Sequence, residues 1–162
     1  MDLVYAPADI LKKPTISVDD DMDNVVKLAE QMHTLMVQNH GIGLAAPQVG
    51  VDKSFFIIGD KTRYKLAVNP KIIETSEEKV LMTEGCLSFP GIFLKVLRPL
   101  NVVVEYVNNK GETINEKLDG MMSRVFQHEV DHLNGITFDT LVSKLKLDMA
   151  MKKLNKRLKR NG

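Results

Sequence analysis

The chain has 162 residues, of which 44% are hydrophobic and 27% are charged, and its formal net charge is +1. This length and composition are typical of a globular protein with one core, so we expect a single domain over residues 1–162. No run of about 18 apolar residues is present, so we expect no membrane span. The N-terminus has no basic segment followed by an apolar one, which argues against secretion. The single cysteine, Cys86, cannot form an internal disulfide, which favours a reducing compartment.

Charge is unevenly distributed along the chain. Residues 144–162 contain eight lysines and arginines against one aspartate, a net charge of +7, which leaves −6 for the remainder. A basic segment on an acidic body favours contact with an anionic partner. A solvated helix face has the same pattern, so charge alone does not decide between the two.

The first 40 residues predict an extended arm followed by a helix. Pro7 and Pro14 oppose helix formation across residues 1–16. Hydrophobic residues then recur at helical spacing and predict a helix over residues 20–39, through Met22, Val25, Val26, Ala29, Met32 and Met36.

Small residues dominate the next segment, Gly41–Gly50. It matches the dinucleotide-binding pattern G-x-G-x-x-A, but that fingerprint requires a strand before it and a helix after it. Here a helix comes first, and Pro47 disfavours a helix afterwards. We interpret the segment as one whose backbone amides can approach a ligand closely, with the Gln48 carboxamide as a donor. A plain turn between a helix and a strand is the alternative.

The middle of the chain predicts strands. Aromatic and branched residues bounded by turn residues indicate strands at 54–58 and 64–68, and Asn69-Pro70 then marks a break. A further strand is predicted over 79–88, with Val80, Met82, Glu84 and Cys86 on one face. Residues 101–107 and 112–118 resemble a hairpin around the turn 108–111.

Two helices are predicted after the strands, one beginning near Met121 and a last one, within 142–160, ending near residue 159. A helix, several strands and two helices argue for an α+β fold. We expect mixed or antiparallel sheets packed around the helix that begins near Met121, with an N-terminal helix and a C-terminal helix beside them.

His128 and His132 are the strongest chemical signal in the sequence. Being four residues apart, they project from one face of a helix and can bind one divalent metal ion. Glu129 lies beside them and can transfer protons to and from a metal-bound water, and Gly135 is suited to the C-terminal cap. The alternative is an ordinary amphipathic helix with two partly buried histidines.

A catalytic site of this type requires a third protein ligand. No histidine or glutamate follows His132, and Phe138 occupies the position of the last histidine in H-E-x-x-H-x-x-G-x-x-H. We therefore expect an upstream ligand, and the Cys86 thiolate is chemically the best candidate. A glycine and a carboxylate adjoin this thiol, which is unusual for a packing residue, although a lone cysteine can also be a small buried hydrophobe.

Three segments resemble, in order and in spacing, the signature motifs of the peptide deformylase family: Gly41–Gln48, Glu84–Ser88 and Gln127–His132. The similarity extends to residues 10–14, to Pro90-Gly91 and to Arg98, so it covers nearly the whole chain through Gly135. It implies a metal-dependent hydrolase that removes the formyl group from N-formylmethionine of nascent polypeptides. Such an enzyme works in the bacterial cytoplasm, in an organelle, or in a host cell when carried by a virus.

The resemblance also implies roles for individual residues. Cys86, His128 and His132 would bind one divalent ion, most often Fe²⁺, with Zn²⁺, Ni²⁺ or Co²⁺ as substitutes. Glu129 would act as general base and acid. The Gln48 amide and the Leu87 backbone N–H would stabilise the oxyanion.

The expected substrate-binding residues are Ile42, Gly43, Glu84, Gly85, Met121 and Val125. Gly43 would pair with the extended substrate, and Met82 is a further candidate for the methionine pocket, although Met82 and Met121 also suit ordinary core. Glu84 and Arg98 match a buried pair, and Asp131 is expected to orient a ligand histidine. Phe93 and Arg124 depart from the family's usual residues at the pocket rim.

The basic C-terminal segment matches family members that reach the ribosome through a C-terminal helix, and its charge suits rRNA phosphates; we expect no DNA partner. Two other hypotheses remain at this point. A metalloprotease would use the same helix but would require Asp139 or Asp148 as its third ligand. A non-catalytic RNA-binding module would rest on the basic segment alone and would leave Glu129 and Gln48 unexplained.

Overall fold

The computed structural model describes all of residues 1–162 and contains three α-helices and seven strands. The helices are α1 (Met22–Gln38), α2 (Gly120–Leu133) and α3 (Lys144–Asn161). Short 3-10 helices η1, η2 and η3 span Asp9–Lys12, Ala46–Val49 and Phe138–Leu141. The strands are β1 (Gly43–Ala45), β2 (Phe55–Gly59), β3 (Tyr64–Thr75), β4 (Lys79–Cys86), β5 (Phe89–Pro99), β6 (Val102–Val107) and β7 (Thr113–Leu118).

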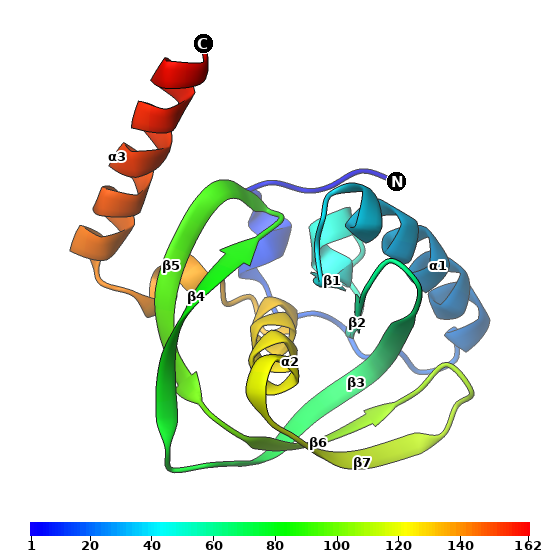
Figure 1. The fold of residues 1–162 in the computed structure, drawn as a ribbon. Coiled ribbons are helices and arrows are strands. Elements are labelled where there is room, and N and C mark those ends of the chain that lie inside the picture. The colour runs from blue at the N-terminus through cyan, green and yellow to red at the C-terminus, as the bar shows by residue number, and fades with distance from the viewer.

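The strands form two separate antiparallel sheets. Five of them pair in the order β1-β2-β3-β6-β7, and β4 pairs only with β5. Helix α2 lies in the middle of the molecule, with the five-stranded sheet on one side and the β4–β5 hairpin on another (Figure 1). The predicted α+β architecture around a central helix is therefore confirmed.

Helix α2 is central because both of its sides are buried. Nine of its 14 residues are buried. Its apolar side, through Phe126, meets the sheet: the Phe126 ring packs edge-on against Phe56, with centroids 4.9 Å apart, and beside Tyr106. Its other side is polar yet equally buried and faces the hairpin; this side contributes Ser123, Arg124, Gln127, His128 and His132. Burying these polar side chains costs free energy unless each finds a hydrogen-bond partner inside the protein.

Helix α3 is attached to the body at one face only. Leu147, Ala150 and Leu154 pack on a cluster formed by the inward side chains of β5 together with Phe138. No residue of α3 is buried, and the helix projects away from the rest of the molecule (Figure 1). None of the helices is both long enough and apolar enough to cross a membrane.

Several predicted boundaries were wrong. The strand predicted to end at Val68 continues to Thr75, because Asn69 adopts φ +48° and the pairing shifts by a bulge instead of stopping. Strand β5 was missed altogether, because its burial alternates over residues 92–98 while its composition does not: Phe93 and Leu97 are apolar yet exposed, and Arg98 is charged yet buried. The extended arm contains the short helix η1 between its two prolines.

Candidate functional site

The structure brings Cys86 and the two histidines of α2 together. Cys86 ends β4, where the pairing with β5 shifts register, and His128 and His132 occupy successive turns of α2. One ligand atom from each of the three residues lies within 4.8 Å of the others. The Cys86 Sγ is 3.3 Å from His132 Nε2, and the two imidazole centroids are 5.0 Å apart.

This donor set fits a single divalent metal ion. One thiolate and two imidazoles are typical ligands of zinc, iron and nickel. Burial, and after it the charges of His128 and Arg98, lower the pKa of His132, so this ring is neutral as a metal ligand must be. Burial would also lower the pKa of His128, but the bonds with Cys86 and Glu84 outweigh it and raise this pKa to about 10, so this ring has to release a proton when a metal ion binds. His128 Nδ1 lies 2.9 Å from Glu84 Oε1, which fixes the ring and leaves its other nitrogen available.

Glu84 is the centre of a buried ionic network. Arg98 donates two hydrogen bonds to its carboxylate, at 2.6 and 2.9 Å, and Arg124 donates a third at 2.5 Å. Burial alone would raise the pKa of Glu84, but the bonds from His128 and Arg98 lower it to about 2. The carboxylate therefore stays ionised, and both of its oxygens are occupied by protein groups. The Glu84 side chain holds the His128 ring. Because both of its oxygens are engaged, only the Glu84 backbone is available to bind a substrate.

Arg124, which departs from the family's usual residue at the pocket rim, does line the cavity, but its charge is used inside the protein. Its side chain is buried and also donates to the backbone oxygens of Val96, at 2.9 Å, and Val80, at 2.6 Å. One guanidinium therefore joins α2 to both strands of the hairpin that carries Cys86. Its position one turn before His128 is the sequence signal that could have identified this role, because residues four apart share a helix face.

Asp131 also differs from expectation. Its carboxylate accepts a hydrogen bond from Arg98 at 2.7 Å instead of orienting a histidine. Arg98 thereby connects Asp131 on α2 with Glu84 on β4. Two carboxylates and two guanidinium groups balance one another in this network.

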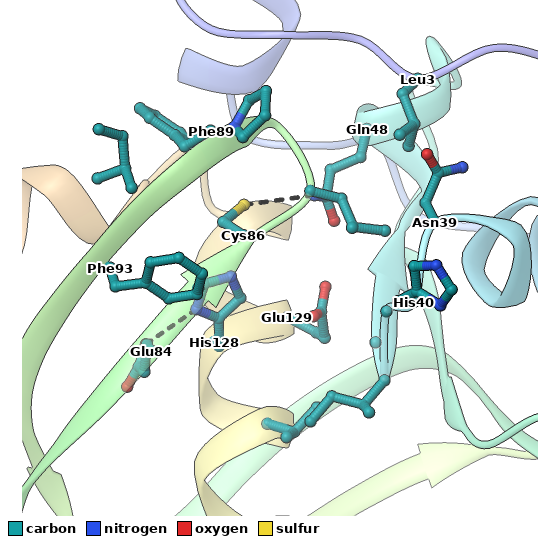
Figure 2. Close-up of a pocket in the computed structure, with 18 of the residues that line it drawn as sticks. Leu3, Asn39, His40, Gln48, Glu84, Cys86, Phe89, Phe93, His128 and Glu129 are labelled. Atoms are coloured by element: carbon teal, nitrogen blue, oxygen red, sulfur yellow. Dashed lines mark hydrogen bonds and ion pairs between the residues drawn. The ribbon is translucent and has the colours of Figure 1, made fainter. Parts of the chain in front are cut away.

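A cavity of about 580 Å³ opens above the cluster. Figure 2 shows Cys86, His128 and Glu129 around it, with dashed lines joining Gln48 to Cys86 and His128 to Glu84. All residues expected to bind substrate line it, namely Ile42, Gly43, Glu84, Gly85, Met121 and Val125, as do Gln48 and Leu87. Met82 is not among the lining residues. Sequence reasoning missed several that are: Leu3, Tyr5, Asn39, His40 and Phe89.

Glu129 lies in this cavity with an unused carboxylate oxygen. The side chain is 3% exposed, and its Oε2 has no hydrogen-bond partner. Burial raises the pKa of Glu129 to about 7. Its Oε1 is 2.5 Å from the place where a Cβ on Gly43 would be, so only glycine allows β1 to pass this close.

The Gln48 amide is held in one orientation. Its Oε1 accepts from the Ala45 backbone N–H at 2.9 Å, and its Nε2 donates to Ser88 Oγ at 3.1 Å and lies 3.5 Å from Cys86 Sγ. Ser88 was not predicted to serve the site, although it belongs to the same short motif as Cys86. The Gln48 amide nitrogen thus donates to Ser88 and also lies next to the thiol.

Replacing Arg124 with methionine tests the network. Val80 and Val96 lose a donor and Glu84 loses one counter-charge, so we expect unfolding free energy to fall by about 2–4 kcal/mol in urea titrations. We also expect metal affinity to fall about 10- to 100-fold. Arg160→Met, on the exposed end of α3, is the matched control. If Arg124→Met matches this control in stability and metal affinity, the hydrogen bonds of Arg124 are not what positions the Cys86, His128 and His132 cluster.

Comparison with known proteins gives a consistent result. The family model for polypeptide deformylase matches residues 1–147. A peptide deformylase of Rhizobium meliloti is 35% identical, and the match covers 99% of this chain and 95% of that protein. One from Thermotoga sp. (strain RQ2) is 41% identical, covering 90% of this chain and 88% of its own length.

Solved structures agree with the sequence matches. The crystal structure of a peptide deformylase from Synechococcus elongatus in complex with actinonin superposes with a TM-score of 0.89 at 38% identity, covering 95% of this chain and 85% of that one. The chain therefore belongs to the polypeptide deformylase family, hydrolases that remove the formyl group from nascent peptides.

Proposed function

We propose that the formyl amide of N-formylmethionyl nascent peptides is hydrolysed at the floor of the cavity, where Cys86, His128 and His132 hold one divalent ion. The observation that carries this proposal is the convergence of the thiol and both imidazoles beside the unpartnered carboxylate oxygen of Glu129. A divalent ion bound there supplies a Lewis acid that acidifies a water molecule.

Glu129 transfers the proton in this proposal. Its Oε2 accepts a proton from the attacking water and later delivers it to the departing amine. The burial of the carboxylate and its unpartnered Oε2 support this role, because no protein group competes with the water for that oxygen.

Gln48 and the backbone N–H of Leu87 stabilise the oxyanion that forms at the formyl carbon. An oxyanion is stabilised most by donors that are oriented before the reaction begins. The bonds from Ala45 and to Ser88 support this role for the Gln48 amide, since they leave it little freedom to rotate.

The backbone of β1 and of Gly85 binds the extended peptide. β1 is an edge strand, and the side of Gly43 next to Glu129 lies on the cavity, which suits addition of a further strand. Ile42, Met121 and Val125 then receive the methionine side chain; the flexible Met121 thioether suits an adaptable apolar pocket.

The two other hypotheses fit less well. In the metalloprotease hypothesis Asp139 or Asp148 completes the ligand set, whereas the clustered third residue is Cys86. The RNA-binding hypothesis does not explain why a carboxylate with an unpartnered oxygen, Glu129, is buried in the cavity.

We propose Fe²⁺ as the native ion, as the resemblance implies, and a cytoplasmic location, where formylated nascent chains are made. An organellar copy, or a virus-borne one in its host, meets the same substrate. The mixed thiolate and imidazole donors also accept Zn²⁺, Ni²⁺ or Co²⁺.

We further propose that α3 docks on ribosomal RNA near the point where nascent chains emerge. The exposed lysines of α3, including Lys152, Lys153 and Lys156, support this, as does the net charge of +7 in residues 144–162. Its attachment through one face leaves the opposite side free for a partner.

Replacing Glu129 with glutamine tests the proton transfer. The change keeps the shape but removes the base, so we expect kcat for formyl-Met-Ala to fall about 10²- to 10⁴-fold while the metal content by elemental analysis stays at the wild-type level. Glu77→Gln, at an exposed glutamate, is the control. Wild-type turnover in Glu129→Gln would contradict the proposed role.

Metal removal tests the cofactor. After anaerobic purification we expect about one iron per chain, loss of activity on treatment with a chelator, and recovery on addition of Fe²⁺ without oxygen. Cys86→Ser serves as the comparison, because a hydroxyl binds these ions far more weakly than a thiolate does. Full activity in iron-free protein prepared without oxygen would exclude Fe²⁺ as the native ion.

Ribosome pelleting tests the role of α3. We expect truncation after Val142, or Lys152, Lys153 and Lys156 changed together to glutamate, to abolish cosedimentation, and wild-type binding to weaken steeply with salt. The charge-matched control changes Lys61, Lys110 and Lys117, which are exposed on the body, to glutamate. Unchanged pelleting of the truncated chain would count against docking through this helix.

A further inference from the structure

Helix α3 touches the rim of the cavity as well as the body. Arg157 Nη2 donates to the Gly91 backbone oxygen at 2.6 Å, and its guanidinium carbon lies 5.9 Å from the centroid of the Phe93 ring. Leu154 covers Gly91 so closely that a Cβ there would be 2.6 Å from Leu154 Cδ1, and Gly91 has φ +78°. Arg157 and Leu154 of α3 therefore both contact the start of β5 at Gly91.

This part of β5 is one wall of the cavity. Gly91, Ile92 and Phe93 all line it. The Phe93 ring in turn covers Gly85, since a Cβ on Gly85 would lie 3.0 and 3.2 Å from two ring carbons. Gly85 directly precedes Cys86, so contacts run from α3 through one aromatic ring to the strand end that carries the thiol. Figure 2 shows the Phe93 side chain among the residues around the cavity.

We propose that Arg157 and Leu154 are positioning residues, which hold the Gly91–Phe93 wall and so set the width of the cleft for the substrate residues that follow formylmethionine. This inference rests on the proposed function, because it takes the cavity as the peptide site. Phe93 is 56% exposed, and an exposed ring without a neighbour has several rotamers open to it. The guanidinium above the ring and the leucine on Gly91 restrict that freedom.

The expected effect falls on binding and not on the chemical step. Arg157 is not among the residues that line the cavity, and it acts on the substrate through Gly91 and Phe93, which do line it. A cation over an exposed ring is a weak contact, so its loss corresponds to about a two- to fivefold change. In the proposed binding mode formyl-Met-Ala ends near the metal ligands, whereas a longer peptide reaches the Gly91–Phe93 wall.

Kinetics with peptides of two lengths provide the first test. For Arg157→Gln we expect KM of formyl-Met-Ala-Ser-Ala to rise about two- to fivefold, with kcat and the KM of formyl-Met-Ala close to wild type. Arg160→Gln removes the same charge from the same helix without these contacts, and we expect wild-type values. Arg157→Lys, which keeps a cation above the ring, should recover part of the loss.

Fluorescence provides a readout that does not depend on activity. The chain contains no tryptophan, so Phe93→Trp creates a single reporter at the wall. In this background we expect Arg157→Gln to shift the tryptophan emission and Arg160→Gln to leave it unchanged.

Two results would overturn the inference. One is identical KM values of Arg157→Gln and Arg160→Gln for the longer peptide. The other is a tryptophan emission spectrum of Phe93→Trp that Arg157→Gln leaves unchanged. A wild-type protein that hydrolyses neither peptide would contradict the proposed function instead, and the emission comparison would still report on the contact.

Discussion

The buried carboxylate of Glu84 is the contact on which the site depends. It lies on the strand that ends at Cys86 and binds a ring on the helix that carries both histidines. Removing a carboxylate from water is costly unless its charge and lone pairs are fully matched. Here two guanidinium groups and an imidazole meet that requirement, and although burial alone would raise the pKa of Glu84, the bonds from His128 and Arg98 outweigh it and keep this pKa low.

The same network explains why the hairpin and the central helix belong to one unit. β4 and β5 pair only with each other, so the hairpin has no place in the five-stranded sheet. Arg124 bonds to a backbone oxygen on each of its strands, and Arg98 extends from β5 to Asp131 on α2. On its opposite side, α2 is fixed to the sheet by the Phe126 ring. The helix therefore holds two independent sheets at a fixed separation.

The sequence predicted the chemistry better than the supports around it. Histidines four residues apart, and a thiol next to a glycine, are local signals that depend on helix and strand periodicity alone. The partners of Arg124 could not be predicted in this way, because two are backbone oxygens 28 and 44 residues away in the chain. The prediction for Asp131 was wrong for a related reason. Being next to His132 in the sequence does not bring the carboxylate to that ring, and its partner is Arg98, which the tertiary fold places nearby.

The predicted strand boundaries were wrong where backbone geometry and strand pairing, and not composition, decide where a strand ends. Asn69-Pro70 reads as a break, yet a left-handed asparagine lets β3 bulge and continue. Strand β5 follows the turn signal Pro90-Gly91 and has no polar and apolar alternation in its sequence, since Phe93 and Leu97 are exposed and Arg98 is buried by its ion pairs. Both errors lie in the sheets, where pairing between distant segments decides the outcome.

The three-residue strand β1 has a consequence for the range of proteins this enzyme can serve. Main-chain amides are the same in every polypeptide, so an edge that pairs with them distinguishes very little between one client and the next. Gly43 at the head of this edge has no side chain, and Leu44 and Ala45 are buried, so the strand exposes no side chain that could favour a particular sequence. In the proposed binding mode, selectivity by side chain rests on the first residue and its formyl cap, while the Gly91–Phe93 wall sets the width of the cleft for the residues that follow; this suits a catalyst that must process nearly every newly made chain of a proteome.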